Sequence, residues 1–152
     1  MAKIEISEFI KRPPQDIFDY CTDPANLAEW QSNTEHAEWI SNCKPGIGSK
    51  FIVVSTIGGA KTESVMQVTI WDRPHRYGFR SIDIPFPVKR LEGITTFTPR
   101  ENGTILAFKG LVAFSVLFRL GESLVSKHTH KQEGDNIIAM KQLLEAGYPR
   151  NL

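Results

Sequence analysis

The feature that most constrains the fold is a long amphipathic stretch close to the C-terminus. Residues 119–147 carry apolar side chains at helical spacing and predict one long helix. The preceding part of the chain is punctuated by proline and glycine and predicts mainly short strands. An antiparallel sheet of such strands, closed by one terminal helix, leaves room for an apolar molecule between the two layers.

The N-terminal segment predicts one strand followed by two short helices. Apolar and polar side chains alternate over residues 2–10, as in a half-buried strand. The Pro13-Pro14 pair ends this strand, and a short helix is expected over residues 15–22. A second helix should begin after Asp23, because aspartate caps helices and the following proline fits a first turn.

Six further strands are expected between residues 35 and 114. The clearest turn signal is Asn102-Gly103, which supplies the left-handed backbone of a bulged hairpin. The predicted order is strand, two helices, six strands and one helix, which gives an α+β fold with a seven-stranded antiparallel sheet. Residues 1–152 are expected to form a single domain, since a chain of this length fits one core.

Composition and charge narrow the functional classes. The chain is 41% hydrophobic and 23% charged, which is ordinary for a soluble globular protein. Its formal net charge of +1 and dispersed basic residues argue against a nucleic-acid interface. The sequence has neither an apolar signal-peptide run at its N-terminus nor about 20 consecutive apolar residues. We therefore expect a cytoplasmic protein with no integral membrane association and no nucleic-acid partner.

Neither a metal nor another cofactor is expected. His128 and His130 are two positions apart on the predicted helix, so they point about 160° apart and cannot share a metal. No spacing of the zinc-ribbon kind or of the two-histidine, one-carboxylate kind is present. Cys21 and Cys43 are interpreted as free thiols of a reducing compartment.

The terminal helix has two different halves. With His130 taken as the reference direction, Ser126, Gly134 and Ile137 lie within about 40° of it. The C-terminal half of this face is apolar and should pack on the sheet, whereas the first half is small and polar. Two interpretations remain open for the first half: it roofs a cavity in which His130 is the fixed polar group, or it faces solvent.

The candidate ligand-binding residues combine this helix face with the inner surface of the sheet. On the last strand the even-numbered positions are favoured, and two tryptophans and a phenylalanine between prolines are expected at the entrance. Most of these side chains would also serve as ordinary core. The full set is Trp30, Trp39, Phe51, Val53, Val68, Phe79, Phe86, Phe108, Val112, Phe114, Ser126, His130, Gly134 and Ile137.

General acid–base chemistry is the only catalytic option that the residues suggest. Histidine titrates near physiological pH, so His130 is the candidate acid or base for a bound carbonyl compound. Glu63, Arg80 and Glu92 are its possible partners if their strands turn them inward. The alternative is that all three face solvent, as charged side chains on strands usually do.

Several short segments together resemble a known family. The resemblance begins with Ile17-Phe18-Asp19-Tyr20 and continues, in order, through much of the chain. The matching segments are 23–30, 46–51, 68–72, 97–104 and 140–145. They resemble the START-like (SRPBCC) superfamily, and within it the polyketide cyclase/dehydratase-like branch, which shares the fold of the major birch-pollen allergen.

The resemblance implies a helix-grip fold, in which a curved seven-stranded sheet wraps around the long C-terminal helix and two short helices follow strand 1. It also implies a soluble protein, monomer or homodimer, that holds a small hydrophobic molecule such as a lipid, a sterol or a polyketide-like compound. One alternative is a cofactor-independent cyclase or dehydratase that uses His130. A further alternative is a protein–protein interaction module related to chaperone activators. The fold alone does not decide among them.

Overall fold

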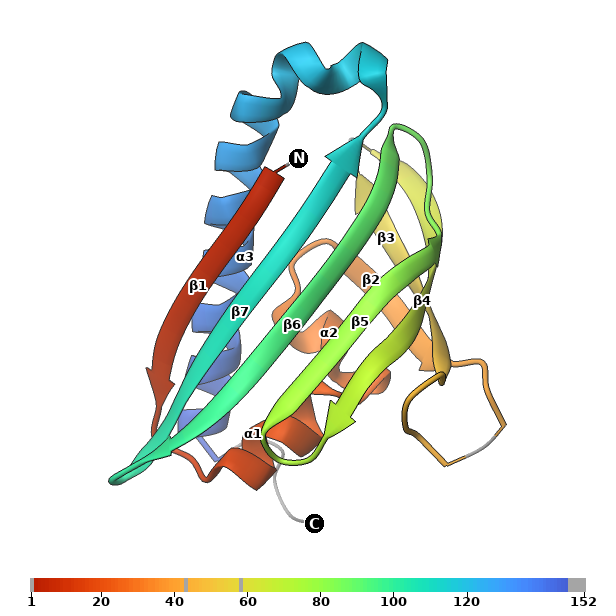
Figure 1. The fold of residues 1–152 in the computed structure, drawn as a ribbon. Helices are drawn as coiled ribbons and strands as arrows, with labels where there is room; N and C mark the ends of the chain where they lie inside the picture. The colour runs from red at the N-terminus through yellow and green to blue at the C-terminus, as the bar shows by residue number, and fades with distance from the viewer. Residues whose placement is uncertain (1, 43, 58, 148–152) are drawn as a thin grey trace.

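The architecture is the predicted α+β arrangement of one seven-stranded sheet and a long terminal helix (Figure 1). A computed structural model describes residues 2–42, 44–57 and 59–147, without the side chains of Ile57, Arg119 and Leu120. The elements are β1 (Ala2–Ile10), α1 (Pro14–Cys21), η1 (Pro24–Asn26), α2 (Leu27–Trp30), β2 (Thr34–Trp39), β3 (Lys50–Ile57), β4 (Ala60–Asp72), β5 (Arg76–Asp83), β6 (Val88–Arg100), β7 (Gly103–Phe114), η2 (Val116–Gly121) and α3 (Glu122–Glu145).

The predicted elements are present in the predicted order, with small differences at their ends. The terminal helix begins three residues later than expected, at Glu122, because residues 116–121 form the 3-10 turn η2. The strand expected over residues 35–42 is β2, which ends at Trp39. At the β6–β7 turn Asn102 has a φ of 64°, the left-handed backbone that the Asn-Gly pair predicted.

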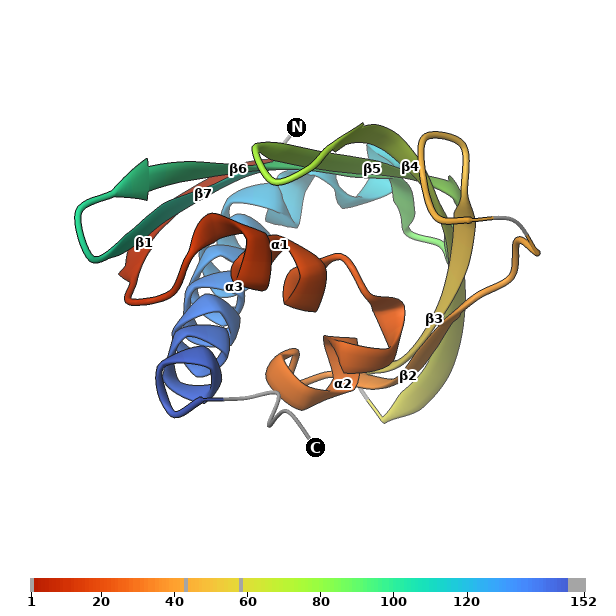
Figure 2. The same cartoon turned by 90° about the horizontal axis from the view of Figure 1, so that it is seen from below.

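The sheet is an antiparallel meander to which β1 is added at one end. The strand order is β1-β7-β6-β5-β4-β3-β2, so each strand from β2 to β7 lies next to its sequence neighbours. β1 pairs along its whole length with β7, from Ala2 opposite Val112 to Ile10 opposite Thr104. The sheet curves around the helices, with α1 and α3 on its concave side (Figure 2). This curvature is what places a helix face opposite the inner surface of the sheet.

Helix α3 covers the free edge of β1. The Lys141 Nζ donates to the Phe9 carbonyl oxygen at 2.7 Å, and a ring nitrogen of His130 lies 3.2 Å from the Glu5 carbonyl oxygen. The Lys11 backbone N–H donates to Glu145 Oε1 at 3.1 Å. These contacts cover the edge of β1, which would otherwise be available to pair with another chain. They also fix α3 and β1 relative to each other.

Many of the most completely buried side chains lie at the end of the sheet that α1 covers. Ile17 and Phe18 of α1 are fully buried. The Phe18 ring makes edge-to-face contacts with Trp71 and Phe97, with centroid separations of 5.3 and 5.4 Å. An eight-residue helix is not stable by itself in water, so α1 depends on this apolar face for its stability.

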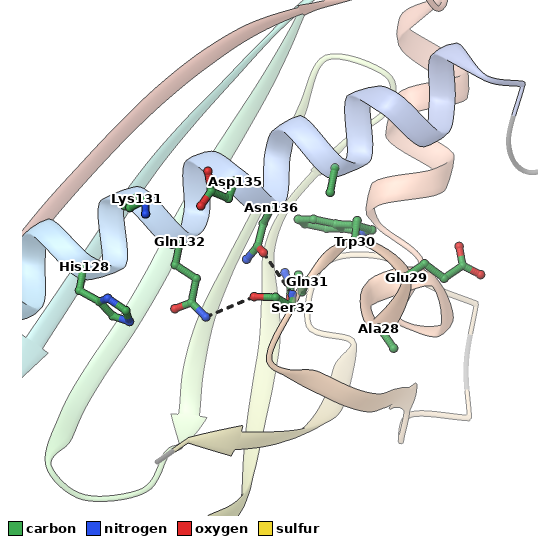
Figure 3. Close-up of a pocket in the computed structure, with 11 residues that line it drawn as sticks. Ala28, Glu29, Trp30, Gln31, Ser32, His128, Lys131, Gln132, Asp135 and Asn136 are labelled. Carbon is green, nitrogen blue, oxygen red and sulfur yellow. Dashed lines mark hydrogen bonds between the residues drawn. The ribbon is translucent and has the colours of Figure 1, made fainter. Parts of the chain in front are cut away.

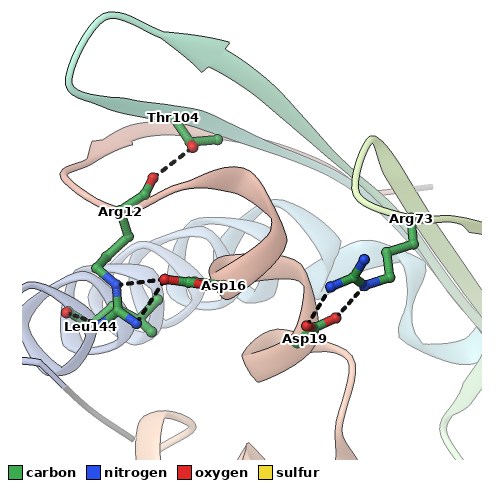
Figure 4. A network of polar contacts seen from close by, with 6 residues as sticks. All are labelled: Arg12, Asp16, Asp19, Arg73, Thr104 and Leu144. Carbon is green, nitrogen blue, oxygen red and sulfur yellow. Dashed lines mark hydrogen bonds and ion pairs between the residues drawn. The ribbon is translucent and has the colours of Figure 1, made fainter.

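Polar contacts fix both ends of α1 (Figure 4). Arg12 Nη1 donates to the Leu144 carbonyl oxygen at 2.7 Å, and Arg12 Nε donates to Asp16 at 3.2 Å. At the other end, Arg73 makes a bidentate ion pair with Asp19, with both N···O distances 2.7 Å. These contacts tie α1 to the end of α3 and to the β4–β5 turn.

We expect the change Thr104→Val to lower the free energy of unfolding by about 1–2 kcal/mol. Thr104 is fully buried, and its hydroxyl donates to the Arg12 carbonyl oxygen at 2.8 Å. Valine has nearly the same shape but leaves that carbonyl without its donor. Urea unfolding measures the change, and Thr98→Val on the exposed face of β6 is the control. Equal stability of Thr104→Val and the wild type would contradict the prediction.

Candidate functional site

Two glycines lie side by side in the middle of the concave face of the sheet. Gly110 of β7 is opposite Gly93 of β6, and Gly93 is opposite Phe79 of β5. A Cβ atom on Gly93 would lie 2.6 Å from Cε2 of Phe108 and 3.0 Å from Cε1 of Phe79. Because neither position has a side chain, ring atoms of Phe79 and Phe108 can lie close to the backbone of Gly93. Phe79 and Phe108 thereby form an aromatic floor on the inner face of the sheet.

Several large apolar side chains of the inner face are only half-buried, although Val68, opposite Phe79, and Val112 on the last strand are buried. Phe97, Leu106 and Leu144, at the α1 end, are at most 2% exposed. Toward the other end the inner face carries large apolar side chains that contact the core and still keep accessible surface. These are Val53, Phe79, Leu91, Phe108 and Phe114. An apolar side chain that lies inward and stays accessible is a candidate to contact a bound apolar molecule.

Glu133 is an ionisable group on the side of α3 that faces the sheet. Ile137, Met140 and Leu144 are the buried apolar side chains of that face. Glu133 lies within about 40° of each of them around the helix and is half-buried. Desolvation raises the pKa of its carboxyl from 4.5 to about 6. The carboxyl has therefore lost much of its hydration while the side chain keeps accessible surface.

A groove of about 570 Å³ lies next to this region, between α3 and residues 28–32 (Figure 3). The Asn136 Oδ1 atom accepts a hydrogen bond from the Ser32 backbone N–H at 3.1 Å, and Gln132 Nε2 lies 3.5 Å from Ser32 Oγ. The indole Nε1 of Trp30 is buried without a hydrogen-bond partner among the described residues. The groove is lined mainly by polar side chains, in contrast to the apolar inner face of the sheet.

The predicted binding residues differ in how deeply they are buried. Phe51, Val68, Val112 and Ile137 are buried core side chains. Half-buried positions are held by Trp30, Trp39, Val53, Phe79, Phe108, Phe114, Ser126 and Gly134. Phe86 and His130 are exposed. Contact of any of them with a ligand stays a prediction.

His130 lies beside the edge of β1, and the centre of the inward helix face passes through Glu133 instead. The helix face predicted from the sequence is centred on His130, about 60° around α3 from Glu133 and closer to β1. The apolar residues Ile137, Met140 and Leu144 all lie within about 40° of Glu133 around the helix. Their spacing is therefore the sequence signal that points to Glu133 as the polar residue of this face. Of the proposed charged partners, Glu63 and Arg80 are exposed, and Glu92 forms an ion pair with Arg90 at 2.9 Å.

Other groups with potential chemistry are placed as follows. Cys21 is a buried free thiol, and desolvation raises its pKa to about 12. Cys43 lies outside the described residues. In the part of the chain that the structure describes, no three His, Cys, Asp or Glu side chains form a cluster suited to a metal ion. Within the same residues, no helix is both long enough and apolar enough to cross a bilayer.

Comparison with known sequences identifies one family. The profile of the family described as "Polyketide cyclase / dehydrase and lipid transport" matches residues 1–138. The uncharacterized proteins Rv1546 and MT1597 of two Mycobacterium tuberculosis strains are each 31% identical over 77 residues. That stretch covers 49% of this chain and 52% of each relative, so the match spans about half the length of both.

Comparison with solved structures shows the same fold. The protein TTHA0849 of Thermus thermophilus superposes with a TM-score of 0.80 at 19% identity, covering 95% of this chain and 99% of that one. Ara h 8.0201 gives 0.73 at 11% identity, with 95% and 98% coverage. The di-domain ARO/CYC BexL of the BE-7585A biosynthetic pathway gives 0.77 at 14% identity, with 95% and 47% coverage. At these identities the likeness concerns the fold alone.

Proposed function

Because the chain belongs to the family of polyketide cyclases, dehydrases and lipid transport proteins, we propose that it binds a small, mainly apolar molecule between the sheet and α3. The observation that carries the proposal is the half-buried aromatic floor of Phe79 and Phe108 on the inner face. Large apolar side chains on the inner face of a sheet are usually buried, whereas these two keep accessible surface. A bound apolar molecule would complete their burial.

The same site indicates the chemistry of the ligand. Apolar walls with one or two fixed polar groups are typical of small-molecule sites, in which the polar groups set the orientation. Glu133 supplies such a group on α3, and Ser126 lies two turns before it on the same face. The proposed ligand is therefore a lipid-like or polyketide-like molecule with a hydroxyl or carbonyl group directed at α3. The family description includes polyketide cyclases, and the similar protein BexL comes from a biosynthetic pathway; both support the polyketide class as one candidate.

A large side chain placed on the helix side of the proposed site should weaken ligand binding. Ser126 is half-buried, so Ser126→Trp would place an indole against the inner face, whereas Ser123→Trp would place it in solvent. We expect the neutral apolar dye Nile red to bind the wild type and Ser123→Trp with similar, saturable affinity. For Ser126→Trp we expect an affinity at least about tenfold lower, because the indole competes for the same volume.

Fluorescence titration measures both variants, and circular dichroism confirms that they are folded. Equal binding of Nile red by Ser126→Trp and Ser123→Trp would place the dye elsewhere and contradict the proposed site. Native mass spectrometry of the purified protein, followed by organic extraction, would identify the class of any ligand that is carried through purification.

A second candidate function is acid–base catalysis at the same site. General acids work best when their pKa lies close to the operating pH, and the pKa of Glu133 is raised to about 6. If the protein is a dehydratase, Glu133→Gln should abolish loss of water from a β-hydroxyketone test substrate and retain binding of Nile red. Equal turnover by Glu133→Gln and the wild type would exclude Glu133 as the acid.

A further inference from the structure

One end of the molecule exposes a group of large apolar side chains, of which only Phe86 is among the predicted ligand-binding residues. Leu117 is 85% exposed and Leu124 is 74% exposed, although both are leucines. Monomeric soluble proteins rarely expose large contiguous apolar patches without a partner. This group, called the apolar tip below, consists of Phe86, Val116, Leu117, Phe118, Leu124 and Val125.

The apolar tip is one surface built from two segments that are distant in sequence. The rings of Phe86 and Phe118 are in edge-to-face contact, with centroids 5.3 Å apart. The Ser115 backbone N–H donates to the Pro87 carbonyl oxygen at 2.9 Å, which fixes the β5–β6 loop beside η2. Figure 1 shows both segments at the end of the molecule that lies away from α1 and the β6–β7 turn.

Basic side chains lie next to the apolar tip. Lys89 lies three residues after Phe86, and Lys127 and Lys131 lie on α3 within two turns of Leu124. Arg90 is already paired with Glu92 at 2.9 Å. Lys89, Lys127 and Lys131 are exposed. Three exposed lysines thus lie beside the exposed side chains of the apolar tip.

We propose that the apolar tip docks on an anionic lipid surface. Proteins are held at membrane interfaces by two kinds of side chain together. Apolar side chains enter the boundary of the acyl chains, and neighbouring lysines meet the acidic headgroups. A second copy of the chain is the less favourable occupant. In a two-fold dimer the same surface faces itself, so the basic residues of one protomer would oppose those of the other.

The apolar tip lies next to the groove shown in Figure 3. Leu124 and His128 are four residues apart on α3 and share a face, so the groove begins one turn behind the apolar tip. Docking would bring the end of the groove at His128 close to the lipid headgroups. It requires neither an occupied interior nor catalysis, so its test is independent of the proposed function.

The test is co-sedimentation with vesicles of phosphatidylcholine alone and of phosphatidylcholine mixed with phosphatidylglycerol. We expect the wild type to sediment with the mixed vesicles, and to do so less at high salt. Leu117→Glu should lower this partitioning at least about tenfold, because it removes an inserted side chain and adds a repelled charge. The matched control Ile47→Glu makes the same charge change at a 73% exposed residue of the β2–β3 loop and should bind like the wild type.

Neither substitution removes a core side chain, and thermal unfolding checks that both variants stay folded. A second variant, Lys127→Glu, should weaken binding to the mixed vesicles without altering an apolar contact. A wild type that stays in solution with both kinds of vesicle would overturn the proposal. So would equal binding by Leu117→Glu, or a wild-type dimer that Leu117→Glu dissociates in the absence of any vesicle binding.

Discussion

Replacing Phe18 with alanine is expected to lower the free energy of unfolding by about 3–5 kcal/mol. The Phe18 side chain is fully buried and meets the rings of Trp71, Phe97 and Tyr77 at centroid separations of 5.3, 5.4 and 6.4 Å. Alanine would leave a cavity among these three rings, because the surrounding strands are fixed by their ladders and cannot close it.

Urea unfolding followed by circular dichroism measures this effect as a lower transition midpoint with an unchanged slope. Phe86→Ala is the matched control, since it removes the same atoms from a side chain that is 69% exposed. It should change stability by less than about 0.5 kcal/mol. A loss of stability at Phe18 no greater than that at Phe86 would mean that α1 is not held by this aromatic cluster.

The second large effect concerns Glu133 and depends on pH. Burial raises the pKa of its carboxyl from 4.5 to about 6, so the folded state prefers the protonated form. The stabilisation from this preference is fully present below pH 4.5 and is lost as the pH rises through about 6. Above that range the folded protein holds a charged carboxylate in a poorly hydrated position, at a cost of about 1–2 kcal/mol.

Glutamine cannot ionise, so Glu133→Gln should remove this cost. We expect the variant to be more stable than the wild type by about 1–2 kcal/mol at pH 7.5 and nearly equal to it at pH 4. Urea unfolding at the two pH values provides the measurement. Glu101→Gln, at an exposed residue of the β6–β7 turn, controls for the change in net charge and should differ little from the wild type at either pH. If Glu133→Gln is no more stable than the wild type at pH 7.5, the carboxyl of Glu133 does not lie in a poorly hydrated position.

The element order could be read from local signals because those signals act over a few residues. Pro13-Pro14 ends the first strand wherever the chain is placed, since proline lacks the donor for a strand ladder. Asn102-Gly103 forms the β6–β7 turn because these residues adopt left-handed backbone easily. The alternation of side chains on the last strand likewise indicated Leu106 and Val112, which are both buried.

The environment of each candidate site residue depended on contacts that are remote in sequence. Helical periodicity defines angles between residues of α3, but it does not define which direction faces the sheet. That direction is set by packing of Ile137, Met140 and Leu144 on the core and by the contacts of His130 and Lys141 with the edge of β1. Glu133 therefore lies inward and His130 beside the edge.

By itself, the sequence determined the fold class, the order of strands and helices, and the apolar character of the inner face, because turn chemistry and side-chain periodicity are local properties. The tertiary structure alone decided which side of α3 faces the sheet and that Phe79 and Phe108 meet over Gly93. It also decided that Phe86 joins Phe118 in one exposed surface. These features arise from register, curvature and helix docking, which bring together residues that no local pattern connects.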